Sequence, residues 1–184
     1  MTQTALEEQA RAARPLAALD AGLAGLRALP RTRLKRPGMA LGPGIAVQYA
    51  GKSGVVARAE GLGADGFGLT LDDRGASPWF SLELSLPVEA LRRARFLGLR
   101  LAGAAQAGVA ALHPVLRLHA EQGWSDHDAG RDFALTPAEA EQTVILSLDR
   151  MAGRDDAASA TLILFLRQRA AGLRLARIDP FLAE

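Results

Sequence analysis

The sequence predicts a mainly β protein, an antiparallel β-sandwich of the jelly-roll kind preceded by a helical N-terminal arm. From Met39 onward, apolar and polar residues alternate with a period of two, as they do in half-buried strands. Turns rich in glycine and aspartate separate these segments, and few helical segments intervene, unlike in a parallel α/β sheet. We therefore expect an arm and linker over residues 1–37 and one sandwich domain over residues 38–184.

Composition agrees with one domain and excludes several classes of chemistry. The chain has 184 residues, 49% of them hydrophobic, which can fill one sizeable core. The formal charge is +2 and the arginines are scattered, so we expect no nucleic-acid partner. There is no cysteine, which excludes a disulfide, a thiolate zinc site and a cysteine nucleophile.

The N-terminal segment resembles neither a signal peptide nor a membrane span. It is charged and lacks a continuous apolar stretch, and no later run approaches eighteen uninterrupted apolar residues. We therefore expect a protein that is cytoplasmic at synthesis and has no membrane span.

The arm carries a leucine stripe at the spacing of a helix. Its members recur three and four residues apart: Leu16, Leu19, Leu23 and Leu26. Leu6 extends the stripe weakly, whereas Pro30 and the basic run of residues 31–36 predict its end and a linker. A stripe this short is marginal alone, so it must pack against the sandwich, a copy of itself or a partner.

Alternation is clearest in the first half of the predicted sandwich. Residues 45–49 and 67–71 alternate, and residues 79–86 do so over the longest stretch. In that stretch the leucines and Phe80 point one way, while Trp79, Ser81, Glu83 and Ser85 point the other.

The later elements follow the same reasoning. A helical turn begins at Pro87, and strands are expected at residues 97–101, 116–118 and 144–148. Residues 136–139, Thr-Pro-Ala-Glu, have the form of a capping box and predict a helical turn. Residues 161–166 are apolar on both faces, which predicts a covered central strand, with residues 173–178 as its hairpin partner.

Acidic residues concentrate in residues 121–132, which we expect to form a loop. Asp126, Asp128 and Asp132 have roughly the close spacing with which oxygen ligands could hold calcium, and we expect no other cofactor. The segment lacks the glycine and the final glutamate of a calcium loop. The alternative is an ordinary turn in which aspartate bonds its own backbone.

The sequence contains no recognisable catalytic machinery. The three histidines, His113, His119 and His127, stand outside any GxSxG or HExxH pattern. We therefore expect no enzyme activity.

A candidate ligand surface follows from the parity of the strands. The side chains that point away from the leucine face share one surface if their strands are neighbours: Trp79, Ser81, Glu83, Arg100, Arg117 and His119. Sugars are bound by an aromatic face beside planar hydrogen-bonding groups. We predict that Trp79 or Trp124 stacks on a ligand while Glu83, Arg100 and Arg117 supply hydrogen bonds. The alternative is an ordinary polar face with Trp79 covered by the helix or a loop.

The order of these segments resembles the jelly-roll domains of the galactose-binding-like and carbohydrate-binding-module type. The resemblance lies in SPWFSLELSLP, ARFLGLRL, ATLILFL and LRLARIDPFL and covers about Gly44 to Leu182. It implies non-catalytic binding, often of sugars and often beside a structural calcium, but no family residue can be carried over by position.

Two functions from different classes are open at this point. One is a module that binds carbohydrate or polysaccharide. The other is a structural or assembly subunit, such as a surface spike, which docks on a protein partner through its N-terminal helix or forms a homo-oligomer.

Overall fold

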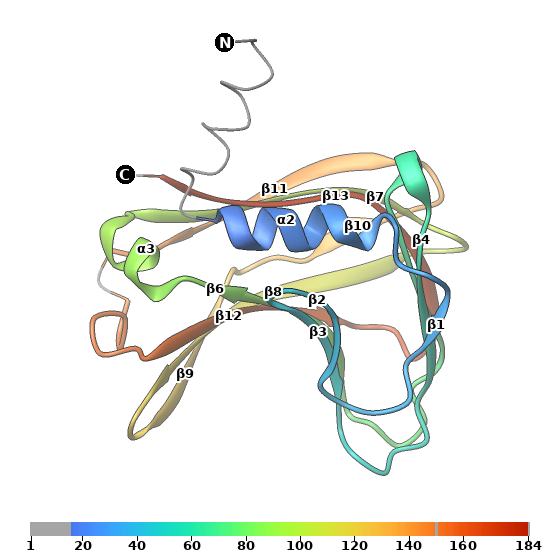
Figure 1. Cartoon of the computed structure of the whole chain (residues 1–184), viewed down its shortest axis with the longest axis horizontal. Coiled ribbons are helices and arrows are strands. Elements are labelled where there is room, and N and C mark those ends of the chain that lie inside the picture. The colour runs from blue at the N-terminus through green and yellow to red at the C-terminus, as the bar shows by residue number, and fades with distance from the viewer. Residues whose placement is uncertain (1–15, 150, 184) are drawn as a thin grey trace, which may run out of the picture.

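The computed structural model describes residues 16–149 and 151–183. Two antiparallel sheets pack face to face as a sandwich, which confirms the predicted fold class (Figure 1). None of the helices in the described ranges is long and apolar enough to cross a membrane.

In the described residues, thirteen strands form the two sheets, and every pairing is antiparallel. The six-stranded sheet has the order β1 (Thr32–Arg33), β4 (Val56–Gly61), β5 (Phe67–Asp73), β13 (Ala171–Ala183), β7 (Phe96–Ala105) and β11 (Ala140–Ser147). The seven-stranded sheet has the order β10 (Phe133–Leu135), β8 (Ala110–Ala120), β12 (Ser159–Leu166), β6 (Phe80–Leu86), β3 (Ile45–Tyr49) and β2 (Met39–Gly42), with β9 (Gly123–Asp128) paired to β8. The helical elements are α2 (Ala17–Leu26), η1 (Gly63–Asp65) and α3 (Val88–Arg93).

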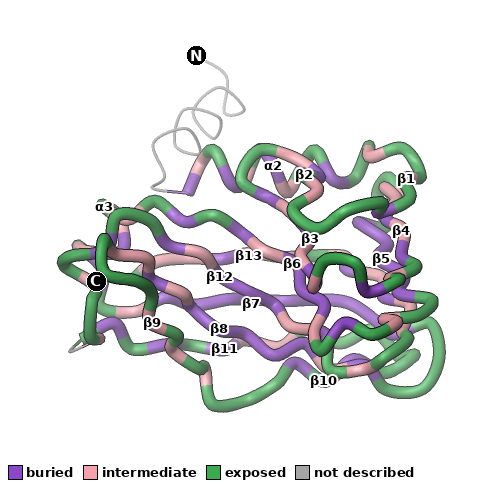
Figure 2. The backbone as a smooth tube through the Cα atoms, turned by 90° about the horizontal axis from the view of Figure 1, so that it is seen from below, coloured by how far each residue is buried: buried purple, intermediate pink, exposed green. Residues whose placement is uncertain are grey.

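The hydrophobic core lies between the two sheets, where Figure 2 shows buried backbone running along their central strands. Alternate leucines supply it: Leu82 and Leu84 from β6, Leu162 and Leu164 from β12, and Leu97, Leu99 and Leu101 from β7. Each is almost inaccessible to solvent, and burying such a side chain contributes about 1.5–3 kcal/mol. The period-two pattern of the sequence therefore fixes which face of each strand is inside.

Helix α2 lies along one side of the sandwich and belongs to the same core (Figure 1). Leu16, Leu19 and Leu26 are buried, and Leu23 packs partly against the core. Of the three alternatives for the leucine stripe, the structure has the first, packing against the chain's own sandwich. Leu6 and the rest of residues 1–15 lie outside the described residues.

The expected linker and the acidic loop are both partly strand. Residues 32 and 33 pair with β4 as an edge strand, although the division of the chain at residue 37 stays a prediction. The expected loop at residues 121–132 contains β9, which forms a hairpin with β8. Neither segment has an apolar stripe long enough to indicate a strand.

Two other predictions are wrong. Strand β13 is not the hairpin partner of β12, because β12 lies between β8 and β6 while β13 lies between β5 and β7 in the opposite sheet. The helical turn at residues 136–139 does not form. The Thr136 hydroxyl donates to the Ala138 carbonyl at 3.1 Å, instead of accepting a backbone N–H as a helix cap does.

Candidate ligand-binding face

The strand register places four of the predicted ligand residues on the outer face of the seven-stranded sheet. Glu83 lies opposite Ile163, Arg117 opposite Thr161 and Asp126, and Trp124 opposite His119. Residues directly opposite on neighbouring strands point to the same face, and so do residues two apart on one strand. Trp79, immediately before β6, completes this group.

A hollow of about 430 Å³ lies on this face. Its lining comes from β3 and the turn after it, the residue before β6, and β6, β8 and β12: Gln48, Tyr49, Ala50, Gly51, Trp79, Glu83, Arg117, His119, Thr161 and Ile163. It therefore combines two aromatic side chains, a carboxylate, a guanidinium, an imidazole and an amide.

Two contacts hold Trp79 in the lining of the hollow. Its ring meets the ring of Phe165 edge to face, with the centroids 6.3 Å apart. The Ser77 hydroxyl donates to the Trp79 carbonyl at 2.5 Å and accepts the Ala50 N–H at 3.0 Å, which ties β6 to the turn after β3. The indole is half-buried and preorganised, so little side-chain entropy would be lost on binding.

Glu83 is half-buried, and it is the carboxylate among the described residues that line the hollow. Burial raises its pKa, against the hydrogen bond from Ser81 and the nearby charges of Arg117 and His119, which lower it. The Ser81 hydroxyl donates to its Oε1 at 3.3 Å. Glu83 is thus a partly dehydrated carboxylate with an incomplete set of hydrogen bonds, suited to accept a hydroxyl group.

Arg117 links the sheet to the β9 hairpin. Its Nε and Nη2 donate to the two carboxylate oxygens of Asp126, each at 2.7 Å. This pairing raises the pKa of Arg117 and lowers that of Asp126. The guanidinium also lies over the Trp124 ring, 5.5 Å from its centroid.

Trp124 is the most exposed large aromatic residue on this face, with 67% of its surface accessible. Its strand, β9, pairs with β8 alone among the described strands and extends away from the body of the sandwich (Figure 1). One ring face meets Arg117, so the rest of the indole is available to a ligand.

Arg100 does not join this group. It lies on β7 in the opposite sheet, where its guanidinium approaches Glu141 at 3.6 Å and Asp179 at 3.7 Å. The predicted shared surface is therefore wrong for Arg100. Alternation shows that its side chain points outward, but it carries no information about which sheet the strand joins.

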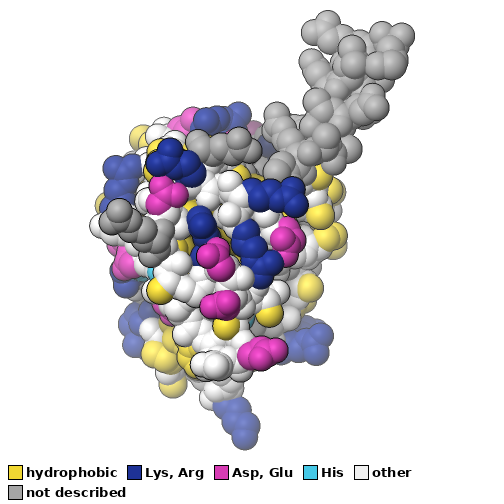
Figure 3. All heavy atoms as spheres, turned by 90° about the vertical axis from the view of Figure 1, so that its left-hand side faces the viewer, with side chains coloured by type: hydrophobic (Ala, Val, Ile, Leu, Met, Phe, Trp, Pro, Cys, Tyr) yellow, Lys and Arg dark blue, Asp and Glu magenta, His cyan; other side chains and the backbone are white. Residues whose placement is uncertain are grey.

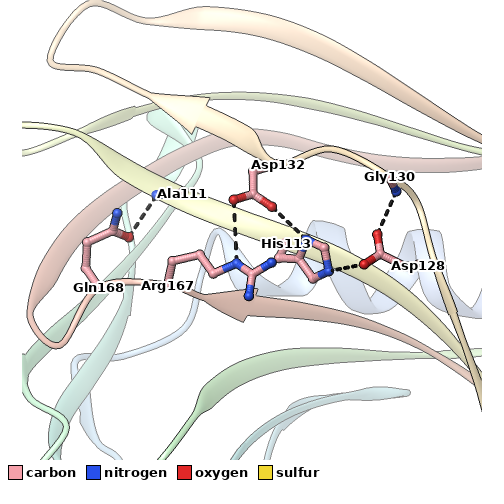
Figure 4. A network of polar contacts seen from close by, with 7 residues as sticks. All are labelled: Ala111, His113, Asp128, Gly130, Asp132, Arg167 and Gln168. Carbon is pink, nitrogen blue, oxygen red and sulfur yellow. Dashed lines mark hydrogen bonds and ion pairs between the residues drawn. The ribbon is translucent and has the colours of Figure 1, made fainter.

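The acidic segment surrounds a histidine instead of converging on an ion site. His113 Nε2 lies 2.9 Å from Asp128, and Nδ1 lies 2.6 Å from Asp132, which also approaches Arg167 (Figure 4). The other carboxylate, Asp126, is directed to Arg117. No group of three or more His, Asp or Glu residues in the described part of the chain could hold a metal ion, so the expected calcium gains no support from the geometry.

Asp128 also makes the local bond that the alternative predicted. Its Oδ1 accepts the Gly130 N–H at 2.6 Å, which closes the turn between β9 and β10 (Figure 4). His113 and Phe165, which the sequence did not indicate as ligand residues, are both on this face. His113 is an even number of residues from Arg117 on β8, and Phe165 is an even number from Thr161 on β12. This spacing in the sequence could have indicated that they face the same side.

Comparison with known proteins places this fold in one structural class. No family model and no curated protein matches the chain. Solved structures do: the chain has the β-sandwich fold of carbohydrate-binding modules, as the resemblance in the sequence implied.

Two of these structures illustrate the likeness. One is the CBM22-1 xylan-binding domain from Paenibacillus barcinonensis Xyn10C, which is 13% identical, with 84% of this chain and 86% of that chain covered at a TM-score of 0.50. The other is a CBM4 structure, which is 17% identical, with 80% and 90% covered at a TM-score of 0.51. At these identities the likeness is one of fold.

Proposed function

We propose that the chain is a non-catalytic carbohydrate-binding module that holds a glycan on the outer face of its seven-stranded sheet. One observation carries the proposal: Trp79, Glu83, Arg117 and Trp124 are on one face, and three of them line the same hollow. The carbohydrate-binding modules of the same fold support it.

Each residue has a role that suits sugar chemistry. The faces of pyranose rings carry C–H groups that pack on an indole, so Trp79 and Trp124 serve as two stacking surfaces. The half-buried Glu83 accepts a hydroxyl, and Arg117 donates from the guanidinium nitrogen that does not bond Asp126. The position of Trp124 on the outlying β9 hairpin favours a ligand of several sugar units over a single one.

No observation favours the assembly alternative. Three leucines of the stripe on which that alternative rested, Leu16, Leu19 and Leu26, are buried in the sandwich core, and Leu23 packs partly against it.

The test is a titration of intrinsic tryptophan fluorescence with soluble xylo-oligosaccharides, cello-oligosaccharides and mixed-linked glucan oligosaccharides. Each single variant, Trp79→Phe or Trp124→Ala, keeps the other tryptophan as the reporter. We expect Trp124→Ala to weaken binding about two- to tenfold, because an aromatic contact contributes about 0.5–1.5 kcal/mol. Arg117→Ala should weaken binding as well, because it removes a hydrogen-bond donor and the guanidinium that lies over the Trp124 ring.

Arg100→Ala is the matched control, since Arg100 is an outward arginine on the opposite sheet. It should bind as the parent does. If no saccharide in the panel changes the fluorescence, or if Arg100→Ala weakens binding as much as Arg117→Ala, the proposed site is wrong.

A further inference from the structure

The charge of the chain is unevenly distributed along the sequence. From Ala21 to Ala59 there is no aspartate or glutamate. The same stretch holds seven cations: Arg27, Arg31, Arg33, Lys35, Arg36, Lys52 and Arg58. Residues 31–36, which we call the basic edge, hold four of them around β1, the last strand on one side of the six-stranded sheet.

The backbone of the basic edge presents hydrogen-bonding groups to its open side. The Leu34 N–H donates to the Ala57 carbonyl at 2.9 Å and so faces β4. Backbone groups of successive residues in a strand face opposite sides, so the N–H and C=O of Arg33 face away from β4. No described strand pairs with β1 on that side.

The side chains of the basic edge alternate between the core and the outer face. Leu34 is buried, and its carbonyl accepts the Tyr49 hydroxyl at 3.4 Å. Arg31, Arg33 and Lys35 alternate with it and are exposed. Arg33 lies directly opposite Arg58 of β4, so two cations face the same side of the sheet.

Few carboxylates balance these charges. Arg58 pairs with Asp72 at 2.5 Å, and Arg31 approaches Glu60 at 3.9 Å. Within the described ranges, Arg33, Lys35 and Arg36 contact no carboxylate. At the end of the sandwich that faces the viewer in Figure 3, by contrast, acidic and basic side chains are interspersed.

We propose that the basic edge binds an extended acidic peptide segment, which adds a strand beside β1 and places carboxylates at alternate positions. Alternate residues of a strand are about 6.5–7 Å apart, so such carboxylates have the same repeat as Arg31, Arg33 and Lys35. The Arg33 N–H and C=O supply the main-chain bonds, and the cations select acidic side chains. Main-chain bonding favours a peptide over an anionic glycan, and Tyr49, the aromatic residue that touches this segment, is buried.

Binding of a fluorescent peptide of alternating Asp and Thr to the full chain tests the proposal, with an Asn-Thr peptide as the uncharged probe. We expect the Asp-Thr peptide to bind at low salt and to release as salt is added. The double variant Arg33→Glu/Lys35→Glu should weaken binding about tenfold or more. Arg93→Glu is the control: it reverses the charge of an exposed arginine of α3 that pairs with no described carboxylate. This variant should bind the peptide as the parent does.

Main-chain pairing is tested separately from charge. Arg33→Gln removes only the cation, whereas Arg33→Pro also removes the N–H at a sheet edge where proline is tolerated. Arg33→Pro should therefore bind more weakly than Arg33→Gln, and in the parent chain the Arg33 amide should exchange more slowly with peptide bound. Undiminished binding by the double variant would overturn the proposal. So would equal binding of an anionic polysaccharide without protection of the Arg33 amide, since the edge would then be a general polyanion surface.

Discussion

Arg117 and Asp126 form a two-point contact between β8 and β9, with both nitrogen-to-oxygen distances at 2.7 Å. This contact holds the strand that carries Trp124 against β8, because Trp124 lies two residues from Asp126 on the same strand. The ion pair thus orders part of the candidate site as well as linking the two strands.

Asp126→Asn should therefore affect stability modestly and in a pH-dependent way. The hydrogen bonds from Arg117 hold the pKa of Asp126 below its usual value, so the stabilisation is present above the unfolded-state pKa and is lost as pH falls through the folded-state pKa. Both side chains are partly exposed, so we expect about 1 kcal/mol or less at neutral pH. Urea unfolding of the parent and the variant should differ at neutral pH and converge in acid; a constant difference would contradict this.

The stability that Glu83 contributes should depend on pH in the opposite sense. Burial raises its pKa, so the folded chain holds its proton at pH values where the unfolded chain has lost it. The associated stability is fully present below the unfolded-state pKa and is lost as pH rises through the folded-state pKa. Glu83→Gln should remove this slope from a pH series of urea unfolding. Glu121→Gln, at an exposed carboxylate in the turn before β9, is the control and should leave the slope unchanged.

Two glycines of α2 should respond to alanine with opposite signs. A β-carbon at Gly22 would lie 2.4 Å from the Pro43 carbonyl oxygen, so the helix would have to move off the sheet. A β-carbon at Gly25 would meet nothing within 4 Å. We expect Gly25→Ala to stabilise by about 0.5–1 kcal/mol through helix propensity, and Gly22→Ala to destabilise by about 1–3 kcal/mol through the clash. Thermal unfolding measures both, and a stabilising Gly22→Ala would show that α2 is not seated as described.

The sequence predicted the inward and outward faces of the strands well, for a physical reason. A residue such as Leu84 is inside because burying it is favourable in any pairing of its strand, so parity alone identifies it. The same parity correctly set Glu83 and Arg117 outward. It could not show that Arg100 lies on the other sheet, because sheet membership depends on long-range pairing and not on the local pattern.

Strand β9 illustrates a second limit. Its residues alternate between exposed and half-buried, because β9 pairs with one strand and covers no core. Because the segment has no apolar stripe, its sequence predicts an acidic loop, and its aspartates suggest ion ligands. Only the register with β8 shows that Asp126 faces Arg117, and only the turn after β9 brings Asp132 to His113.

Gln142 joins the two sheets at the side of the sandwich opposite α2, and its removal should open that side. Its side-chain amide donates to the Ala134 carbonyl at 2.6 Å and accepts the Ala134 N–H at 3.2 Å, which connects edge strand β11 to β10. Gln142→Ala loses both bonds and should cost about 1–2 kcal/mol. Gln142→Glu keeps the acceptor but faces the carbonyl with a carboxylate, so it should be no more stable than Gln142→Ala near neutral pH and should recover as the carboxylate is protonated. Ser147→Ala, on the same strand, is the control for urea unfolding. Hydrogen exchange at the Ala134 amide should rise in Gln142→Ala, which removes the acceptor of its N–H, and rise less in Gln142→Glu, which keeps one. If it does not rise, the side of the sandwich is held by contacts other than this amide.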